Sequence, residues 1–348
     1  MQGVVFLGER KLEIQEFPDP TPGSGEVVLA VKASGMCGSD LKVYRAPLGE
    51  GLKDLNVGGK GPVIAGHEPC GVVAEIGPCV PEAAARVGMR VMVHHYSGCG
   101  VCKHCRTGWS QLCLEGIKVY GITEHGGHAQ YIKVPAATLV PLPDELSFEV
   151  GAAVSCGTGT AYSALRRIRL SGPDTIAIFG QGPVGLSATL LAKAMGARVI
   201  ALDVAEARLA LAKEFGADVV IDPEKDDPIQ TINDLTHGEG ADLAMDCSGS
   251  PDARLAAVRS TRTWGTVGLV GEGGTLTVEV STDLMRRQLT LVGSWTFSTV
   301  GQAECARFIV DRRIPVEKQF THRYQLDQAA EAYKLFDTQT TGKGVFLL

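Results

Sequence analysis

A strand, a glycine-rich turn, a helix and a second strand follow one another between Thr175 and Asp203. The apolar run TIAIF leads into the turn GQGPVG at residues 180–185, and a segment with helical periodicity then closes at Gly196. Strand, turn and helix in this order supply the structural context that the G-x-G-x-x-G pattern of a β-α-β unit requires. The segment therefore predicts an α/β fold with a doubly wound parallel sheet.

The turn has the properties that a bound dinucleotide needs. Gly180 would allow the tight bend, Gly182 would let the backbone approach a pyrophosphate, and Gly185 would let the helix pack on the strand. The free N–H groups of the helix start would face the anion. Proline suits that first helical turn because its missing N–H would have no partner there. The candidate dinucleotide-binding residues of the turn are Gly180, Gly182, Pro183, Val184 and Gly185.

Asp203 lies at the end of the second strand, eighteen residues beyond Gly185. A carboxylate there can accept hydrogen bonds from an adenosine ribose and would repel a ribose phosphate. No arginine follows before Arg208, a further candidate cofactor-binding residue. The unit therefore favours NAD over NADP. The alternative interpretation of Asp203 is an N-cap for the helical segment at 206–215.

Length and charge limit the classes of function. A chain of 348 residues suggests two domains of ordinary size. Its net charge of −6 offers no basic surface for nucleic acid or acidic membranes. The N-terminal residues lack the pattern of a signal peptide, and no apolar run is long enough to span a bilayer. A cytoplasmic protein with neither nucleic acid nor membrane as a partner is expected.

The remaining segments divide the chain into two regions. Residues before 174 have short apolar runs typical of β structure, with a glycine-rich loop at 49–61 and a strand that breaks at 66–68 and resumes at Gly71. The tail beyond 295 leaves the α/β alternation, and its final VFLL is expected to pair with the first region. The expected domains are 1–156 with 296–348, and 157–295. Strands of the second are predicted at 176–180, 198–202, 218–221, 242–246, 266–270 and 289–293.

Four of the ten cysteines form a cluster with the spacing C-x2-C-x2-C-x7-C. This spacing lets one short segment surround a single zinc ion with four thiolates. Two disulfides are the alternative, but two-residue gaps make poor disulfide partners and a reducing compartment is expected. A nucleic-acid zinc ribbon is disfavoured by the negative charge. With no open position, the predicted site is structural, in a lobe at about 95–115. Its ligands are Cys99, Cys102, Cys105 and Cys113.

Several motifs together resemble the zinc-dependent medium-chain alcohol dehydrogenases. They are Cys37-Gly38-Ser39-Asp40, Gly66-His67-Glu68, the four-cysteine lobe, Cys156 and the GQGPVG turn, and they follow one another in the family's order. The resemblance implies a β-rich GroES-like catalytic domain and a Rossmann domain with six parallel strands. It also implies NAD, two zinc ions per subunit, one catalytic and one structural, and a small alcohol or carbonyl compound as substrate. A homo-oligomer, tetramer or dimer, is expected.

The same resemblance implies roles for the remaining motif residues. Cys37, His67 and Cys156 match the ligands of the catalytic zinc, and two thiolates with one imidazole leave the open position that catalytic zinc needs. Glu68 matches a carboxylate beside the metal and is a possible alternative ligand. Ser39 matches the hydroxyl that takes the substrate proton. Where family members often place histidine three residues later, this chain has Lys42, so either Lys42 or water would complete the relay.

Two residues are candidates for the substrate pocket, His95 and Trp295, and the latter is expected near the nicotinamide. The predicted reaction is reversible NAD-linked oxidation of a primary or secondary alcohol to an aldehyde or ketone by hydride transfer. The alternative is a polyol or threonine-type dehydrogenase, although polyol enzymes of this superfamily typically use glutamate where this chain has Cys156. A non-catalytic NAD-binding protein would not need an open metal site. A zinc-free quinone reductase conflicts with both cysteine sets and with Asp203.

Overall fold

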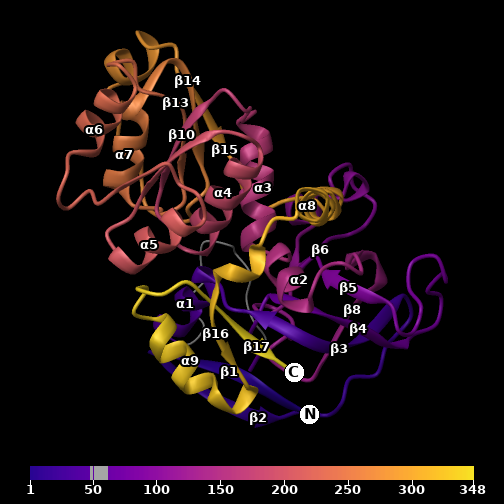
Figure 1. Cartoon of the computed structure of the whole chain (residues 1–348). Coiled ribbons are helices and arrows are strands. Elements are labelled where there is room, and N and C mark those ends of the chain that lie inside the picture. The colour runs from indigo at the N-terminus through magenta and orange to yellow at the C-terminus, as the bar shows by residue number, and fades with distance from the viewer. Residues whose placement is uncertain (48–49, 51–61) are drawn as a thin grey trace. The chain divides into compact units, whose positions relative to one another are not determined.

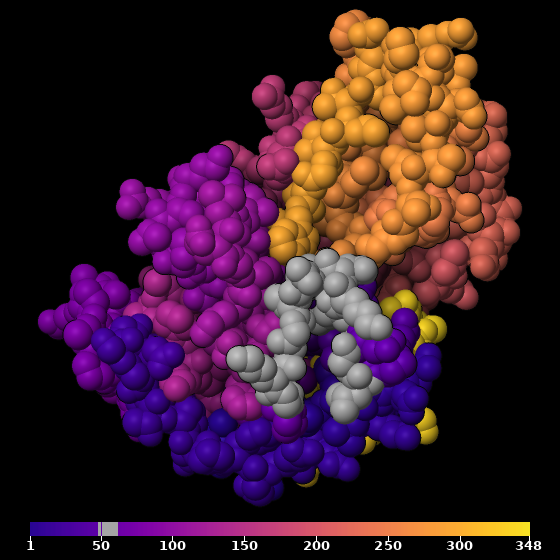
Figure 2. Space-filling view, turned by 180° about the vertical axis from the view of Figure 1, so that it is seen from behind, coloured from indigo at the N-terminus to yellow at the C-terminus, as the bar shows by residue number. Residues whose placement is uncertain are grey.

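The computed structural model describes residues 1–47, 50 and 62–348, and the others are grey in Figures 1 and 2. The glycine-rich loop expected at 49–61 therefore lies, except for Glu50, outside the described residues. Among the described helices, none combines the length and apolar character that crossing a bilayer requires. The chain forms two compact units, a first of Met1–Gly159, Phe297–Gln339 and Lys343–Leu348, and a second of Thr160–Thr296 and Thr340–Gly342.

The second unit is built on a six-stranded parallel sheet with the order β12-β11-β10-β13-β14-β15. Helices α4 and α5 pack together on one face, and α6 packs beside α7 on the other (Figure 1). The strand order reverses beside β10, as in a doubly wound fold, and the prediction of that fold is confirmed. The elements are β10 (Thr175–Phe179), α4 (Pro183–Ala194), β11 (Arg198–Leu202), α5 (Glu206–Glu214), β12 (Val219–Ile221), α6 (Pro228–Leu235), β13 (Ala241–Asp246), α7 (Pro251–Ser260), β14 (Thr261–Leu269) and β15 (Thr290–Gly293).

Strand β14 begins five residues earlier than the predicted 266. Thr261 pairs with Ala241, and the register then shifts so that Thr266 pairs with Leu243. Between these pairs Trp264 has a φ of +64° and an exposed side chain. An irregular start of this kind has no regular alternation of apolar and polar residues, so the sequence pattern detects only the regular part.

The first unit contains a mixed seven-stranded sheet in which β3 is central. Strand β3 pairs antiparallel with β4, β8 and β17, so the C-terminal strand lies beside N-terminal structure. The strands are β1 (Gln2–Gly8), β2 (Lys11–Glu16), β3 (Glu26–Gly35), β4 (Glu68–Ile76), β5 (Arg90–Val93), β6 (Tyr96–Ser97), β7 (Lys118–Val119), β8 (Tyr131–Pro135), β9 (Leu139–Pro141), β16 (Phe320–Tyr324) and β17 (Lys343–Leu347). The helices are α1 (Gly38–Arg45), α2 (Phe148–Val154), α8 (Thr299–Arg312) and α9 (Ala329–Phe336), and α3 (Gly157–Arg167) leads into the second unit.

The structure differs from the prediction in where the strand after residue 66 begins. Strand β4 runs without a break from Glu68, while Ile64 makes only an isolated bridge with Val5. The prediction that the strand resumes at Gly71 is therefore wrong. Gly71 is itself paired with Val31 of β3. A Cβ at Gly71 would lie 2.2 Å from the carbonyl oxygen of Ala30, so the close approach of β3 requires glycine there. Here glycine marks close packing of neighbouring strands rather than a strand end.

Candidate metal and dinucleotide sites

Four buried side chains meet in the first unit. Cys37 precedes α1, His67 and Glu68 stand at the start of β4, and Cys156 lies between α2 and α3. Their ligand atoms all lie within 4.8 Å of one another, and the two cysteine Sγ atoms are 3.8 Å apart. Two sulfurs bound tetrahedrally to zinc at about 2.3 Å would be about 3.8 Å apart. The donor set and its spacing therefore fit a zinc ion.

Local backbone structure places two of these residues. Cys37 is the N-cap residue of α1, and its N–H donates to Asp40 Oδ2 at 2.8 Å. Gly66 has a φ of +89°, and a Cβ there would lie 2.3 Å from the ring of His128. Only glycine fits both the left-handed conformation and that space. The turn at Gly66 delivers His67 to the metal-binding cluster.

Electrostatics prepare the cluster for a cation. Asp40 Oδ1 lies 2.8 Å from His67 Nδ1, so the imidazole donates from Nδ1 and keeps Nε2 for a metal. Burial alone would lower the pKa of His67, but the charges of Asp40 and Cys37 raise it well above its usual value. The hydrogen bond from Cys156 and then the charge of His67 hold the pKa of Cys37 well below that of a free thiol. A thiolate is the form that binds metal.

Glu68 is held by a lysine from the end of the chain. Lys343 Nζ lies 2.5 Å from Glu68 Oε2 and donates to the carbonyl oxygen of Met36 at 3.0 Å. Both side chains are fully buried, and burial raises the pKa of Glu68. A Cβ at Gly35 would lie 2.0 Å from Glu68 Oε2, so the absence of a side chain on β3 makes room for the carboxylate. Sequence reasoning missed Lys343.

Ser39 and His95 also lie at the cluster. Ser39 Oγ is 3.2 Å from His67 Nε2 and 3.3 Å from Cys37 Sγ. Lys42 is partly buried and follows Ser39 by one turn of α1. The ring centroid of His95 is 5.0 Å from that of His67, and its Nδ1 lies 2.9 Å from the carbonyl oxygen of Ser155. Burial lowers the pKa of His95, so its ring is neutral beside the metal ligands.

Asp40 is a second residue to which the sequence assigned no role. Its signal was present, because it stands three residues after Cys37, where a carboxylate can cap the first turn of a helix. Trp295 is half-buried and stands two residues beyond the end of β15 in the second unit. It is not among the residues of the metal-binding cluster.

The four lobe cysteines form a second cluster, with all four Sγ atoms within 4.8 Å of one another. Backbone N–H groups point at the sulfurs. Cys99 N lies 3.2 Å from Cys113 Sγ, and Cys102 N lies 3.3 Å from Cys99 Sγ. Backbone hydrogen bonds also lower the pKa of Cys102 to about 6. Four thiolate-capable sulfurs in this arrangement could hold zinc in a closed shell.

The glycine turn of the second unit has the shape that its motif predicts. Gly180 has a φ of +88°, and a Cβ on Gly185 would lie 1.8 Å from the carbonyl oxygen of Gly180. A Cβ on Gly182, the N-cap residue of α4, would meet no protein atom within 4 Å. The space over Gly182 and the helix N-terminus therefore fits a phosphate group. Pro183 and Val184 form the first turn of α4.

Asp203 is tied to the glycine turn. Its Oδ2 accepts from Gln181 N at 2.6 Å, and its Oδ1 accepts from Ala205 N at 2.8 Å. Asp203 therefore organises the loops at the ends of β10 and β11. Arg208 lies 3.9 Å from its Oδ2, and Arg208 Nε donates to the carbonyl oxygen of Thr341.

Comparison with known proteins identifies relatives over the whole chain. Residues 23–144 match the alcohol dehydrogenase GroES-like domain, and residues 183–311 match the zinc-binding dehydrogenase family. The chain is 41% identical to the uncharacterized zinc-type alcohol dehydrogenase-like protein YphC of Escherichia coli K12, over 99% of this chain and 98% of that protein. It is 33% identical to L-threonine 3-dehydrogenase of Pyrococcus horikoshii, over 97% and 95% of the two chains.

Solved structures agree with these relatives. The alcohol dehydrogenase TADH from Thermus sp. ATN1 superimposes with a TM-score of 0.89 at 27% identity, over 100% of this chain and 99% of that one. The matches confirm the predicted GroES-like and Rossmann architecture, and with it an oxidoreductase of a family that uses zinc and NAD on small-molecule substrates. The chain belongs to the zinc-type alcohol dehydrogenases of the medium-chain dehydrogenase/reductase superfamily.

Proposed function

We propose that this protein is an NAD-dependent alcohol dehydrogenase that reversibly oxidises a primary or secondary alcohol to an aldehyde or ketone. The convergence of Cys37, His67 and Cys156 carries the proposal, because the ligand atoms of two thiols and an imidazole lie within 4.8 Å of one another. The first unit serves as the catalytic domain. The second serves as the NAD-binding domain, and the glycine turn and Asp203 support that assignment.

In the mechanism, Cys37, His67 and Cys156 would hold the catalytic zinc, and the contact of Asp40 with His67 Nδ1 orients the imidazole so that Nε2 is available to bind it. When bound, zinc lowers the pKa of an alcohol hydroxyl and NAD accepts a hydride. Ser39 takes the hydroxyl proton at Oγ, which stands 3.2 Å from His67 Nε2. Lys42, one turn further along α1, or water receives that proton next. Glu68 remains beside the ligands, neutralised by Lys343.

The test is NAD reduction by the purified, zinc-loaded protein with a broad panel of alcohols, at equal metal occupancy. Turnover of simple primary or secondary alcohols supports the proposal. Reduction of NAD by no alcohol of the panel would refute it and favour a non-catalytic NAD-binding protein. The metal content is measured on the same sample, and two zinc ions per subunit are expected. An inactive protein with two zinc ions would show that the assignment is wrong, whereas an inactive protein with fewer would show that zinc was lost.

A polyol or threonine-type dehydrogenase is the second candidate. The 33% identity to an L-threonine 3-dehydrogenase favours it, as does the polar ring of His95 at 5.0 Å from His67. Matched substrate pairs separate the two candidates. A vicinal diol should be no better than its mono-alcohol for the simple-alcohol enzyme, and L-threonine should be inert. Strong preference for the diol or for L-threonine would replace the first candidate with the second.

The Asp203 carboxylate is expected to set the coenzyme preference. Wild-type protein should favour NAD over NADP, and Asp203→Asn should reduce that preference by ~10-fold, about 1.4 kcal/mol, because a ribose phosphate would no longer meet a negative charge. The measurement is kcat/KM for both coenzymes. Asp218→Asn is the matched control, since Asp218 also accepts a backbone N–H in the same unit, from Val199. An unchanged ratio in Asp203→Asn would contradict the assignment.

We also propose a homo-oligomer, tetramer or dimer, that works in the cytoplasm. Strand β15 forms an edge of the parallel sheet, and Leu291 on it is 37% exposed. Apolar side chains on an open sheet edge favour pairing with a second copy. All ten cysteines are free thiols and six of them lie in the two metal-type clusters, which supports a reducing compartment. Light scattering on the purified protein tests the assembly, and a monomeric mass would refute it.

A further inference from the structure

A continuous series of buried hydrogen bonds leads away from the metal ligand His67. Beyond Asp40 it reaches the hydroxyl of Tyr333 on α9, which lies 3.3 Å from Asp40 Oδ2. The same hydroxyl lies 2.7 Å from His128 Nε2, and His128 Nδ1 lies 2.8 Å from Ser34 Oγ. All these side chains are buried. The series therefore joins α9 and β3 to the metal-binding cluster through side chains alone.

The donors and acceptors of this series can be ordered in one way. The Tyr333 hydroxyl donates to Asp40 Oδ2. The tyrosine stays protonated because burial raises its pKa well above its usual value. Its oxygen is then free to accept from His128 Nε2–H. Burial lowers the pKa of His128 to about 4, so the ring is neutral and Nδ1 accepts from the Ser34 hydroxyl.

The Asp40 carboxylate accepts hydrogen bonds from three donors. Oδ2 receives Cys37 N–H and the Tyr333 hydroxyl, while Oδ1 remains for His67 Nδ1. Several donors on one buried carboxylate hold it in a single orientation. Held in this orientation, Asp40 Oδ1 accepts from His67 Nδ1, and the lone pair of Nε2 is left for a metal. The tyrosine hydroxyl therefore affects the metal ligand without touching it.

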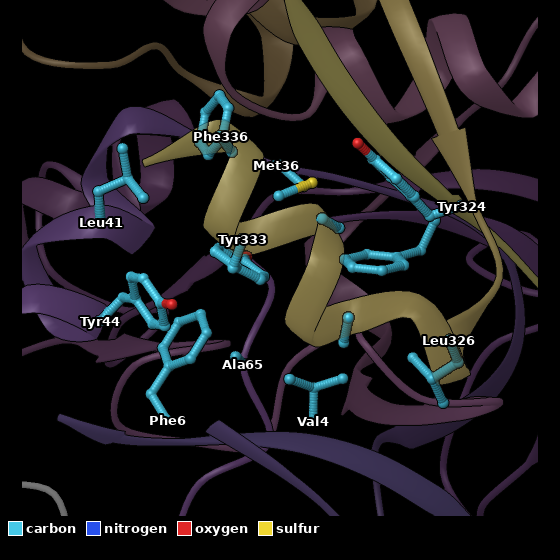
Figure 3. Packing of buried hydrophobic residues seen from close by; sticks show 13 residues of the cluster. Val4, Phe6, Met36, Leu41, Tyr44, Ala65, Tyr324, Leu326, Tyr333 and Phe336 are labelled. Atoms are coloured by element: carbon cyan, nitrogen blue, oxygen red, sulfur yellow. The ribbon is translucent and has the colours of Figure 1, made fainter. Parts of the chain in front are cut away.

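Packing fixes both added residues. Tyr333 projects from α9 into an apolar cluster beside Phe6 and Tyr44 (Figure 3), with its ring centroid 4.8 Å from that of Phe6. His128 lies against Gly66, where a Cβ would come within 2.3 Å of Nδ1. The His128 ring thus supports the turn that carries His67 and also donates to the tyrosine. His128 therefore acts on His67 in two ways, by packing against Gly66 and by its hydrogen bond to Tyr333.

We propose that Tyr333 and His128 are positioning residues that strengthen zinc binding by His67, acting through Asp40. The inference rests on the zinc site of the proposed function, but it does not require any particular substrate. Removing the tyrosine hydroxyl takes one donor from a buried carboxylate and leaves His128 Nε2–H without its acceptor. Loss of a hydrogen-bonding partner behind a ligating histidine typically weakens metal binding by ~10- to 100-fold.

Tyr333→Phe in the full-length protein tests the proposal directly. The zinc dissociation constant is measured by competition with a colorimetric chelator, without alcohol or coenzyme. The zinc ion that Cys37→Ser fails to bind is assigned to the catalytic site, which separates its release from that of the four-cysteine site. We expect Tyr333→Phe to weaken that site ~10-fold or more, with the four-cysteine site unchanged. Tyr324→Phe is the matched control, because Tyr324 is a buried tyrosine of the same apolar cluster. Equal zinc affinity in Tyr333→Phe and Tyr324→Phe would overturn the proposal.

Substitutions at His128 provide a second test that a merely structural role would not pass. Glutamine places an amide N–H where His128 Nε2–H donates, whereas leucine has no donor. His128→Gln should therefore retain most of the zinc affinity and His128→Leu should lose it ~10-fold or more. Equal losses in both variants would contradict the hydrogen-bond role. If Cys37→Ser itself left both zinc ions bound, the zinc site of the proposed function would be wrong, which is a separate outcome.

Discussion

Replacing Cys37 with serine is expected to abolish turnover, by on the order of a thousand-fold or more, while the protein stays folded and still binds NAD. Serine removes one of two sulfurs that stand 3.8 Å apart, and a neutral hydroxyl is a poor zinc ligand. The zinc content should fall from two ions per subunit to one. Elemental analysis, NAD titration by fluorescence and kcat on the best alcohol of the panel check the three parts of this prediction.

Cys102→Ser is the matched control for this experiment. Cys102 belongs to the four-cysteine lobe, so the variant should also lose one zinc ion, but it should mainly lower the thermal midpoint. Turnover measured well below that midpoint should remain within about an order of magnitude of wild type. Similar mild effects of the two serine substitutions would contradict the division into a catalytic and a structural site.

The fold of the second unit could be predicted because short stretches of sequence are enough to mark each of its strands and turns. The inner strands β10, β11 and β13 are largely buried on both faces and therefore appear as short apolar runs. Glycine positions then separate each run from the next helix. Prediction of β14 failed at its start, where Trp264 has a positive φ and the register shifts. This irregularity arises from the pairing of β14 with β13, so the alternation of apolar and polar residues within β14 alone does not reveal it.

The metal-binding cluster divides in the same way. Cys37 and His67 stand in short motifs. Their neighbours Asp40 and Gly66 shape the local backbone, so sequence alone points to both ligands. Lys343 and Tyr333 approach the cluster from β17 and α9, about three hundred residues later. A lysine or tyrosine in an ordinary strand or helix carries no local mark of burial. Their roles follow only from the pairing of β17 with β3 and the packing of α9.

Lys343→Met is expected to cause the largest loss of stability. Lys343 and Glu68 are fully buried and 2.5 Å apart, so removing the ammonium leaves a buried carboxylate without its counter-charge. Breaking a buried ion pair on one side destabilises a protein by ~3–5 kcal/mol. For a unit of this size that corresponds to a fall in thermal midpoint on the order of 10 °C. Calorimetry of the zinc-loaded variant and wild type at neutral pH measures the shift.

The double variant Glu68→Gln/Lys343→Met distinguishes charge burial from lost packing. If the unpaired carboxylate causes the instability, neutral glutamine should recover most of the lost midpoint, because neither side chain then carries a charge. Lowering the pH should also reduce the difference in thermal midpoint between Lys343→Met and wild type. Burial raises the pKa of Glu68 to about 8, so without Lys343 this carboxyl group must take up a proton when the protein folds at neutral pH. The free-energy cost of that uptake falls as the pH drops toward 4.5, the usual pKa of a glutamate in the unfolded chain. Equal instability of the single and double variants would show instead that the methylene stem of Lys343, packed beside Gly35, stabilises this unit.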